Sequence, residues 1–229
     1  MNCLIIGGTS GIGLEAARIF KQKGYEVVVC GRRKNRKIDF NFLKVDVTKE
    51  ASVKKLFKNI SFNKIESLVY SAGQTILKKK ITKFNYKKYK NIHDVNLLGA
   101  IYILKYSYKK LKKAKGKVTI VNSMASKKSS LLSGLEYTVS KAGLSGLVKH
   151  LSLEWAKDKI FINSVYPSMT QTRMLPMNQD YKKIIKSIPL KKLALPNDIA
   201  KAIYFLNSED NQYITGAGID INGGQYLSG

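Results

Sequence analysis

The chain has 229 residues, of which 44% are hydrophobic, and its formal net charge is +26 at pH 7. This length and apolar content suit one well-buried domain, so we expect a single domain over residues 1–229. No apolar run approaches the ~18 residues that a membrane-spanning helix needs, and no basic leader opens the chain. The sequence therefore argues against a membrane protein and predicts a cytoplasmic location.

Lysine supplies most of the charge, because 36 of the 41 basic residues are lysine and only five are arginine. Planar, bidentate recognition of phosphate favours arginine, and the lysines are spread over nearly every polar stretch. A diffuse solvated surface is therefore favoured over a nucleic-acid partner. The two cysteines, Cys3 and Cys30, lie in apolar runs without metal or redox spacing, so we expect buried, reduced thiols and no metal site.

A strand, a glycine-rich turn and a helix are predicted at the start of the chain. Residues 3–8 are typical of a buried strand, and helical periodicity follows up to Gly24. Glycines at G-x-x-x-G-x-G spacing let backbone N–H groups at a helix N-terminus approach a pyrophosphate. Dinucleotide binding is favoured over a turn without function, and the candidate contacts are Gly7, Ser10, Gly11, Ile12 and Gly13.

The second apolar run, residues 25–30, is followed by Gly31, Arg32 and Arg33. At this strand end an acidic residue would bind a ribose 2′-hydroxyl, whereas arginine would accept a 2′-phosphate. Two arginines and no acid favour NADP(H) over NAD(H), although Ser10 adds no basic contact from the turn. Residues 34–42 leave room for little more than one helical turn, which is a lean connection between parallel strands.

Small and polar residues follow the next two predicted strands. Asp46 ends the third strand, where it is placed to contact adenine or to cap the helix predicted over residues 51–60. The fourth strand ends in Ser71, Ala72 and Gly73, whose small side chains let a cofactor approach the backbone. Residues 85–114 are predicted to form one helix, in which Asn96 is either a satisfied core amide or a functional group.

A strand over residues 117–122 leads to Ser123, a polar loop and a long helix from about 136 to 157. Near the start of this helix, Tyr137 and Lys141 share one face. Their spacing alone is weak, because 13 tyrosines and 36 lysines in 229 residues give about two Tyr-x-x-x-Lys pairs by chance and the chain has four.

The last quarter of the chain contains a strand, FINSVYP, then residues 170–196, then a helix over residues 197–207 with an Asn/Asp cap, and a final strand in GAGIDINGG. Residues 170–196, called the lid below, are predicted to be irregular with one helical piece and to cover a binding site. Alternation of apolar strands with amphipathic helices predicts an α/β fold, a doubly wound parallel sheet of about seven strands flanked by helices.

The motifs in this order resemble the short-chain dehydrogenase/reductase family from end to end. The residues that carry the likeness are the glycine turn, Asp46-Val47, Ser71-Ala72-Gly73, Asn96, Ser123, Tyr137-x-x-x-Lys141, Asn163, Pro167, Thr172 and the GAGIDINGG tail. The resemblance implies a Rossmann-type fold and an NADP(H)-dependent oxidoreductase acting on a carbonyl or secondary alcohol. It implies cofactor contacts from the glycine turn and from Arg32, Arg33, Asp46, Val47, Ser71, Ala72, Gly73, Tyr137, Lys141, Pro167, Thr170 and Thr172.

The resemblance also implies four catalytic residues. Tyr137 would be the general acid/base, Lys141 would lower its pKa and bind the nicotinamide ribose, Ser123 would orient the carbonyl, and Asn96 would hold a relay water. A lysine about 4 Å away could lower a phenol pKa from about 10 toward 7. Ile6, Ser71 and Ser168 replace the usual Thr, Asn and Gly, and Ser168 is expected to affect the backbone beside the nicotinamide.

Family members usually form dimers or tetramers through the two long helices, so a homodimer or homotetramer is implied. A beta-ketoacyl-acyl-carrier-protein reductase is the most concrete candidate, and a keto-sugar or polyol reductase remains equally open. Lysines 112, 113, 115, 157 and 159 are expected to flank the site, where they could bind an acidic carrier protein or simply complement the helix dipoles. A non-catalytic dinucleotide sensor or nucleic-acid binder is the alternative of another class, which the Asn–Ser–Tyr–Lys set disfavours.

Overall fold

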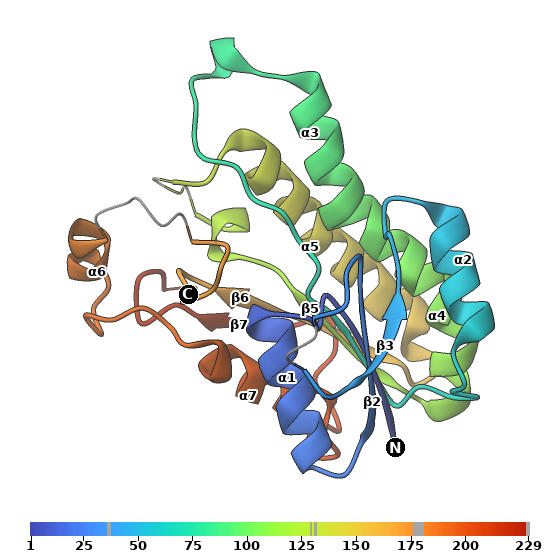
Figure 1. Ribbon diagram of the computed structural model, residues 1–229. Helices are drawn as coiled ribbons and strands as arrows, with labels where there is room; N and C mark the ends of the chain where they lie inside the picture. The colour runs from blue at the N-terminus through green and yellow to red at the C-terminus, as the bar shows by residue number, and fades with distance from the viewer. Residues whose placement is uncertain (36–37, 129, 131, 176–180, 228–229) are drawn as a thin grey trace.

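The computed structural model describes residues 1–35, 38–128, 130, 132–175 and 181–227, and these form a parallel sheet of seven strands between two layers of helices (Figure 1). Across the sheet the strands are β3 (Asn41–Lys44), β2 (Glu26–Gly31), β1 (Asn2–Ile6), β4 (Ser67–Tyr70), β5 (Lys117–Val121), β6 (Phe161–Pro167) and β7 (Gly218–Ile221). The predicted doubly wound parallel sheet is confirmed.

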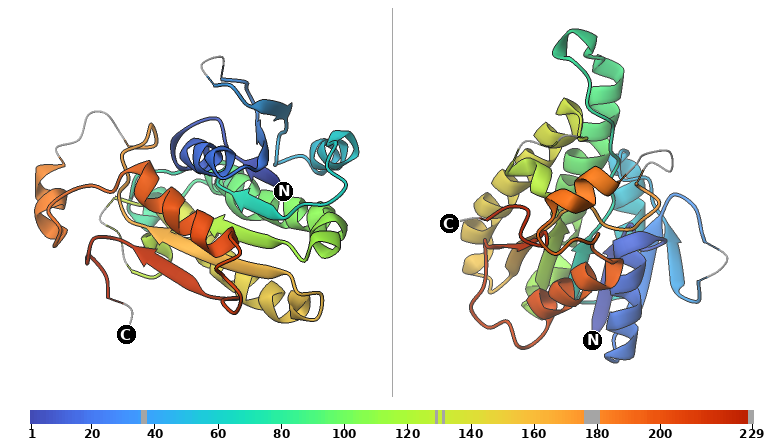
Figure 2. Two further views of the ribbon diagram at one scale, coloured as in Figure 1. Left: turned by 90° about the horizontal axis from the view of Figure 1, so that it is seen from below. Right: turned by 90° about the vertical axis from the view of Figure 1, so that its left-hand side faces the viewer.

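Helices cover both faces of the sheet. One layer holds α1 (Gly11–Gln22) and α7 (Pro196–Asn207), which lie side by side (Figure 2), and the other holds α2 (Glu50–Asn59), α4 (Gly99–Ala114) and α5 (Leu135–Ala156). Three short 3-10 and α-helical pieces lie at the carboxyl ends of the strands: Ile81–Lys83, Met124–Ser126 and α6 (Lys182–Ser187).

Strict alternation along the central strands explains the two layers. In β1, Leu4 and Ile6 belong to the apolar cluster under α2, α4 and α5, whereas Cys3 and Ile5 belong to the cluster under α1 and α7. Successive side chains of a strand point to opposite faces, so a continuous apolar run is buried on both sides. Both cysteines are buried free thiols, as expected.

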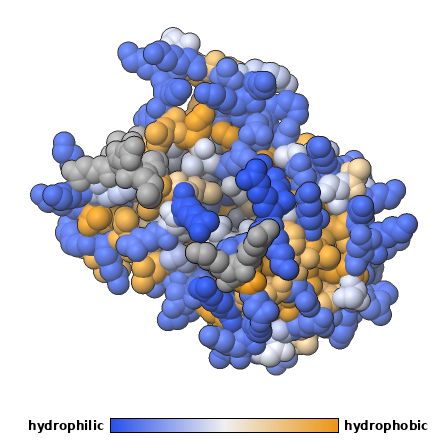
Figure 3. Space-filling model, in the orientation of Figure 1, coloured by the Kyte–Doolittle hydropathy of each residue, from blue (hydrophilic) through white to orange (hydrophobic). Residues whose placement is uncertain are grey.

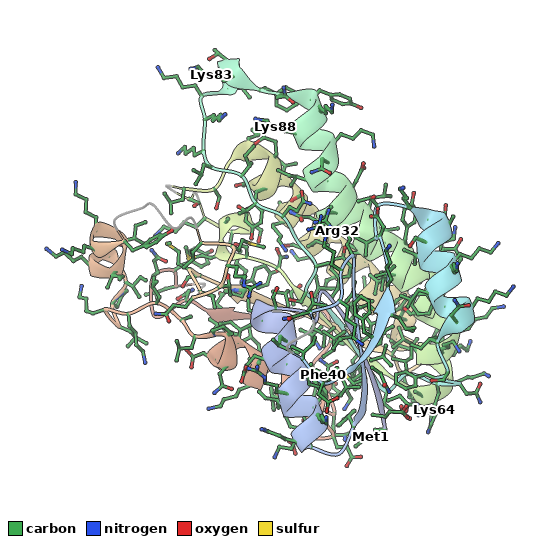
Figure 4. The ribbon with its side chains drawn as sticks, in the orientation of Figure 1. Met1, Arg32, Phe40, Lys64, Lys83 and Lys88 are labelled. Carbon is green, nitrogen blue, oxygen red and sulfur yellow. The ribbon has the colours of Figure 1, made fainter. Side chains whose placement is uncertain are left out.

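The connection between β2 and β3 is as lean as predicted, since none of its described residues is helical. In place of a helix, Ile38 and Phe40 pack against the apolar cluster beside α1. The Lys21 ammonium lies 5.3 Å from the centre of the Phe40 ring, which is a cation–π contact. Phe40 is labelled in Figure 4. Side chains of this non-helical connection therefore cover part of the apolar cluster that a crossover helix would usually cover.

Two predicted helices differ in detail from the structure. The helix expected over residues 85–114 is α3 (Tyr86–His93), a π-helical turn (Asp94–Leu98) and α4 in succession. The last helix begins at Pro196, and Asp198 accepts a 2.8 Å hydrogen bond from the Leu195 N–H group, which caps its first turn. Asn96, the polar residue that sequence periodicity left unexplained, lies inside the π-helical turn.

Charge is distributed widely over the surface. The face in Figure 3 is covered mostly by hydrophilic residues, and Lys64 lies far from Lys83 and Lys88 on the molecule (Figure 4). Within the described ranges, no helix is both long and apolar enough to cross a membrane.

Candidate active site

A cavity of about 890 Å³ opens at the carboxyl ends of the strands. It lies where the strand order turns from β1 to β4, the crevice in which doubly wound sheets bind their ligands. Its lining draws on the chain from Ile6 in β1 to Gln225 near the C-terminus. The lining therefore combines the last residues of several strands with the loops and helices that follow them.

The glycine turn at one end of the cavity depends on close backbone approach. Gly7 has a φ of +85°, and a Cβ atom there would lie 2.5 Å from the Ala72 nitrogen. A Cβ at Gly13 would lie 2.4 Å from the carbonyl oxygen of Gly7, so no larger residue fits either position. Gly7, Ser10, Gly11 and Ile12 line the cavity, whereas Gly13 lies beneath the turn.

The start of α1 is suited to an anion. The helix has no acidic residue in its first turn, and the Ser10 side chain makes no capping hydrogen bond. The N–H groups of the first turn have no helical acceptor, and the macrodipole adds positive potential at this end. The turn is also tied to the β2–β3 connection, because Asn35 donates a 3.0 Å hydrogen bond to the Thr9 carbonyl. These features fit the pyrophosphate of a dinucleotide.

Arg32, Asp46 and Val47 line the part of the cavity where the sequence predicts the adenosine of a dinucleotide, called the adenosine end below, while Arg33 does not contribute to the lining. Burial raises the pKa of Asp46, but hydrogen bonds from Thr48 and the charges of Lys49 and Arg32 outweigh it and hold that pKa below its usual value. The carboxylate accepts from the Thr48 N–H (3.1 Å) and hydroxyl (2.8 Å), so it does not cap α2. A negative carboxylate beside a cation faces the cavity here.

Tyr137, Lys141 and Ser123 meet at the other end of the cavity. The Lys141 ammonium lies 5.7 Å from the centre of the Tyr137 ring and donates a 2.7 Å hydrogen bond to the Val121 carbonyl. The Ser123 hydroxyl, which accepts a 3.1 Å hydrogen bond from the Ala125 N–H, lies close enough to Tyr137 to lower the pKa of its phenol. The predicted serine, tyrosine and lysine are thus brought together at the carboxyl end of β5.

Burial dominates the titration of this group. It raises the pKa of Tyr137, an effect that the Ser123 hydroxyl partly offsets. It lowers the pKa of Lys141 to about 7, so this lysine is only partly charged near neutral pH. Burial of both groups therefore opposes the expected lowering of the Tyr137 pKa by Lys141.

Asn96 lies behind the cavity wall, fully buried in the π-helical turn. Its Oδ1 accepts from the Gln74 N–H (2.8 Å), and its Nδ2 donates to the Gln74 carbonyl (3.0 Å) and to the Ser140 hydroxyl (2.9 Å). Both donors are used, which leaves one acceptor position on Oδ1. π-Helical turns inside α-helices often mark functional sites, because they shift one side chain out of register.

Gly73 leaves a space between Asn96 and Lys141. A Cβ atom at this glycine would lie 3.5 Å from the Asn96 Oδ1 and 3.8 Å from the Lys141 Nζ. A group between these two polar atoms therefore meets no side chain from residue 73. This is the position that a relay water would need, with one acceptor and one donor facing it.

The three unusual residues, Ile6, Ser71 and Ser168, are accommodated without strain. The Ile6 carbonyl accepts a 2.8 Å hydrogen bond from the Ser71 N–H, which joins the ends of β1 and β4. Ser168 donates its N–H to the Ile221 carbonyl at 3.0 Å and is not among the residues with positive φ. A serine there is compatible with the backbone at the end of β6.

The lid begins directly over the glycine turn. A Cβ atom at Gly11 would lie 3.2 Å from the Thr172 methyl group, and Pro167, Thr170 and Thr172 all line the cavity. Beyond them the lining continues through Met174, Leu175 and the α6 residues Ile184 and Ser187. Residues 176–180 of the predicted lid, including Met177, lie outside the described residues.

Several residues of the site were not predicted. Thr9, Gln74, Asn122, Lys128, Arg173 and Gln225 line the cavity, and Ser140 holds Asn96. Asn122 accepts from the Ser123 N–H (2.9 Å) and donates to the Ser145 hydroxyl (3.1 Å), which ties the loop after β5 to α5. Asn122 stands directly before the predicted serine, and this adjacency is the only sequence signal that could have identified it.

The five helix-end lysines do not flank this cavity. Tyr137 is the third residue of α5, whereas Lys157 and Lys159 follow its last turn. At 1.5 Å per residue, about 30 Å of helix separates the two ends. Lys112 pairs with Asp158 at 2.8 Å and Lys113 donates to Asn63 at 2.9 Å, so both are engaged at the amino end of the sheet. The prediction that these five lysines could bind an acidic carrier protein beside the site is therefore wrong within one chain.

Comparison with known proteins gives a consistent family. The family model described as enoyl-(acyl carrier protein) reductase matches residues 7–225. The 3-oxoacyl-[acyl-carrier-protein] reductase FabG of Buchnera aphidicola is 30% identical, over 98% of this chain and 97% of the relative. The acetoacetyl-CoA reductase of an Acinetobacter species is 31% identical, with the same two coverages.

Solved structures agree with the sequence comparisons. ElxO with NADP bound superposes with a TM-score of 0.90, at 29% identity and 98% coverage of both chains. A short chain dehydrogenase family protein from Francisella tularensis gives the same TM-score and coverage at 26% identity. The likeness extends over the whole sheet and its helices, including the segments that form the cavity.

Proposed function

The chain belongs to the short-chain dehydrogenase/reductase family of oxidoreductases, and on this premise we propose that it is an NADP(H)-dependent carbonyl reductase with Tyr137 as its general acid/base. The observation that carries the proposal is the meeting of Ser123, Tyr137 and Lys141 in one cavity with the glycine turn. A phenol, a hydroxyl and an amine at one end, and a helix N-terminus at the other, suit hydride transfer from a dinucleotide to a carbonyl.

Each of these side chains has a defined task. When bound, the nicotinamide supplies a hydride to the carbonyl carbon, and the oxygen becomes more basic. Tyr137 protonates that oxygen, and Ser123, which lines the same end of the cavity, donates to it and fixes its position. Lys141 binds the nicotinamide ribose and, in its charged form, favours the phenolate that remains after proton transfer.

Asn96 and Gly73 support the return of the proton. The acceptor position left on the Asn96 Oδ1 faces the same small space as the Lys141 Nζ. A water held there would hydrogen-bond to Lys141 and could pass on a proton taken up from solvent, which would replace the proton that Tyr137 gives to the substrate. The side-chain amide itself is held rigid by Gln74 and Ser140.

The preference for NADP(H) rests on Arg32. This arginine lines the adenosine end of the cavity and is close enough to Asp46 to affect its titration. A guanidinium suits a 2′-phosphate, and the strand end carries no acidic residue that would bind a 2′-hydroxyl instead. The NADP-bound relative ElxO supports the same preference.

The substrate class follows less directly. The FabG and acetoacetyl-CoA reductase relatives favour a ketoacyl thioester, on an acyl carrier protein or coenzyme A, and a keto-sugar or polyol is the alternative. A homodimer or homotetramer is the assembly that we propose, because the exposed faces of α4 and α5 carry apolar residues such as Ile101, Val139 and Leu153.

One assay tests this function. Purified protein is given NADPH and a panel of ketoacyl thioesters, keto-sugars and simple ketones, and the loss of NADPH absorbance is recorded, with NADH as the parallel cofactor. We expect turnover of at least one class with a clear NADPH preference. No turnover of any carbonyl, or a preference for NADH, would contradict the reductase or the Arg32 argument respectively.

A further inference from the structure

We propose that the substrate carries an anionic group, a carboxylate or phosphate, which Arg173 binds at the lid with Lys128 as a second cation. This inference rests on the proposed function and specifies the substrate of the same cavity. Both residues line the cavity, Arg173 next to Thr172 at the start of the lid and Lys128 beside Gln225 and α6. The substrate would be a carbonyl compound that carries a negative charge apart from the reacting carbon.

Arg173 is an exception in the composition of this chain. Four of the five arginines occur before residue 37, and Arg173 is the fifth. Lysine serves nearly everywhere else as the solubilising cation, so an arginine in the lid suggests a task that lysine performs less well. Planar bidentate binding of a carboxylate or phosphate is such a task. Among the described residues, no carboxylate lies within ion-pair distance of its guanidinium.

Lys128 is held at the cavity by the C-terminal segment. Its ammonium donates a 3.2 Å hydrogen bond to the Gln225 carbonyl, and the Gln225 side chain donates to the Ser187 hydroxyl of α6 at 3.2 Å. Lys128, Gln225 and Ser187 all line the cavity. An ammonium has three donors, so the contact with Gln225 leaves two for a ligand.

The remaining lining of this end is apolar or neutral. Apolar side chains come from both walls and the lid: Leu77, Met124, Leu132, Met169, Met174, Leu175 and Ile184. Within the described lining the single carboxylate is Asp46, which lies at the adenosine end beside Arg32. No described acidic group here offsets the two cations, so an anion with an apolar body between charge and carbonyl matches the surface.

Matched pairs of small substrates test the inference. Steady-state kinetics with NADPH are compared for 4-oxopentanoate against its methyl ester, and for dihydroxyacetone phosphate against dihydroxyacetone. The variants are Arg173→Gln, Arg173→Lys and Lys128→Gln. Lys183→Gln is the control, because Lys183 is an exposed lid lysine outside the lining and its loss lowers the net charge equally.

We expect the parent to prefer the anionic member of at least one pair, which also identifies the anion. Arg173→Gln should raise KM for that anion about 10- to 100-fold with little change in kcat, as expected for a charged hydrogen bond, and leave the neutral member within twofold. Arg173→Lys should recover part of the loss, Lys128→Gln should have a smaller effect, and Lys183→Gln should have none.

Three results would overturn the inference. Turnover without preference for either anion would show that the site is indifferent to charge, and the reductase proposal would still stand. A higher KM for NADPH in Arg173→Gln, with unchanged KM for the substrate, would assign Arg173 to the cofactor. An equal rise in KM for the anion in Arg173→Gln and Lys183→Gln would mean that only the net positive charge of the protein attracts the substrate. Absence of all carbonyl turnover would instead remove the proposed function on which this inference rests.

Discussion

The ammonium of Lys141 donates a 2.7 Å hydrogen bond to the carbonyl oxygen of Val121, the last residue of β5. This contact holds a buried amine at the bottom of the cavity, where burial lowers its pKa to about 7. The Val121 carbonyl compensates the charge of the Lys141 ammonium less well than a carboxylate would, so burial of the charged form costs stability. The proposed function uses that charged form, so stability and function are opposed at Lys141.

Replacing Lys141 by methionine should make stability less dependent on pH. The folded-state pKa of about 7 lies below the ordinary lysine value of 10.5, so the unfolded chain binds more protons between these two pH values. The stability of the parent therefore rises with pH across that window, because the penalty for the buried charge is released. Lys141→Met has no such penalty.

The advantage of Lys141→Met over the parent should fall by about 3 kcal/mol between pH 6 and pH 9.5, as urea unfolding at each pH would measure. Activity should be lost at every pH. Lys149→Met, an exposed lysine of the same helix, is the control and should show no pH-dependent difference. A constant difference across this range in Lys141→Met would mean that Lys141 titrates normally.

Tyr137→Phe should abolish NADPH-dependent turnover, by at least about 10²-fold, because it removes the proton donor and leaves the ring in place. NADPH affinity, measured by fluorescence titration, should change less than about threefold, since Lys141 and the glycine turn remain. The matched control is Tyr86→Phe, which removes the hydroxyl from another Tyr-x-x-x-Lys pair, exposed on α3. Robust activity in Tyr137→Phe would remove this residue from the mechanism.

Arg32→Ala should weaken the preference for NADPH over NADH. A charged hydrogen bond to a 2′-phosphate contributes about 1.5–3 kcal/mol, so its loss should raise KM for NADPH about 10- to 100-fold. KM for NADH should change little. Arg33→Ala should have a much smaller effect, because Arg33 does not line the cavity. Equal losses for both cofactors in Arg32→Ala would indicate a structural role instead.

Gly13→Ala should destabilise the fold severely, by about 3 kcal/mol or more, because the new Cβ would lie 2.4 Å from the Gly7 carbonyl oxygen. Gly146→Ala is its counterpart in α5, since a Cβ there meets no atom within 4 Å. That substitution should stabilise the protein by about 0.5–1 kcal/mol through helix propensity. Thermal unfolding of the two variants would show whether stability falls in Gly13→Ala and rises in Gly146→Ala. Unchanged stability in Gly13→Ala would show that the glycine turn can open to admit a methyl group.

The layers of the fold followed directly from the sequence, because the apolar strands and amphipathic helices alternate without ambiguity. Cys3, Leu4, Ile5 and Ile6 form one unbroken apolar run, and a strand buried on both faces is the simplest structure for it. The lean connection before β3 was predicted from chain length alone. The packing of Phe40 against Lys21, which takes the place of a helix, could not be predicted in the same way. The two residues are distant in the sequence and meet only in the folded chain.

The site was predictable only in part, for a related physical reason. Tyr137 and Lys141 are neighbours along one helix, so their juxtaposition follows from helical spacing. Ser140 binds Asn96 across 44 positions, and Gln225 reaches the cavity from the C-terminus, so neither leaves a local pattern. The directions of the Tyr137 and Lys141 pKa shifts were also missed. Burial dominates both shifts, and the sequence shows which groups are neighbours but not how deeply they are buried.

The span of the cavity lining has a consequence for folding. Its wall runs from Ile6 to Gln225, so the pocket is assembled from segments far apart in the sequence. Cys3 of β1 pairs with Ser67 of β4, and all seven strands pair in parallel, so many of the contacts that build the pocket are non-local and form slowly. A ligand that fills the pocket therefore stabilises contacts between distant parts of the chain, and its effect on unfolding should reach the whole sheet.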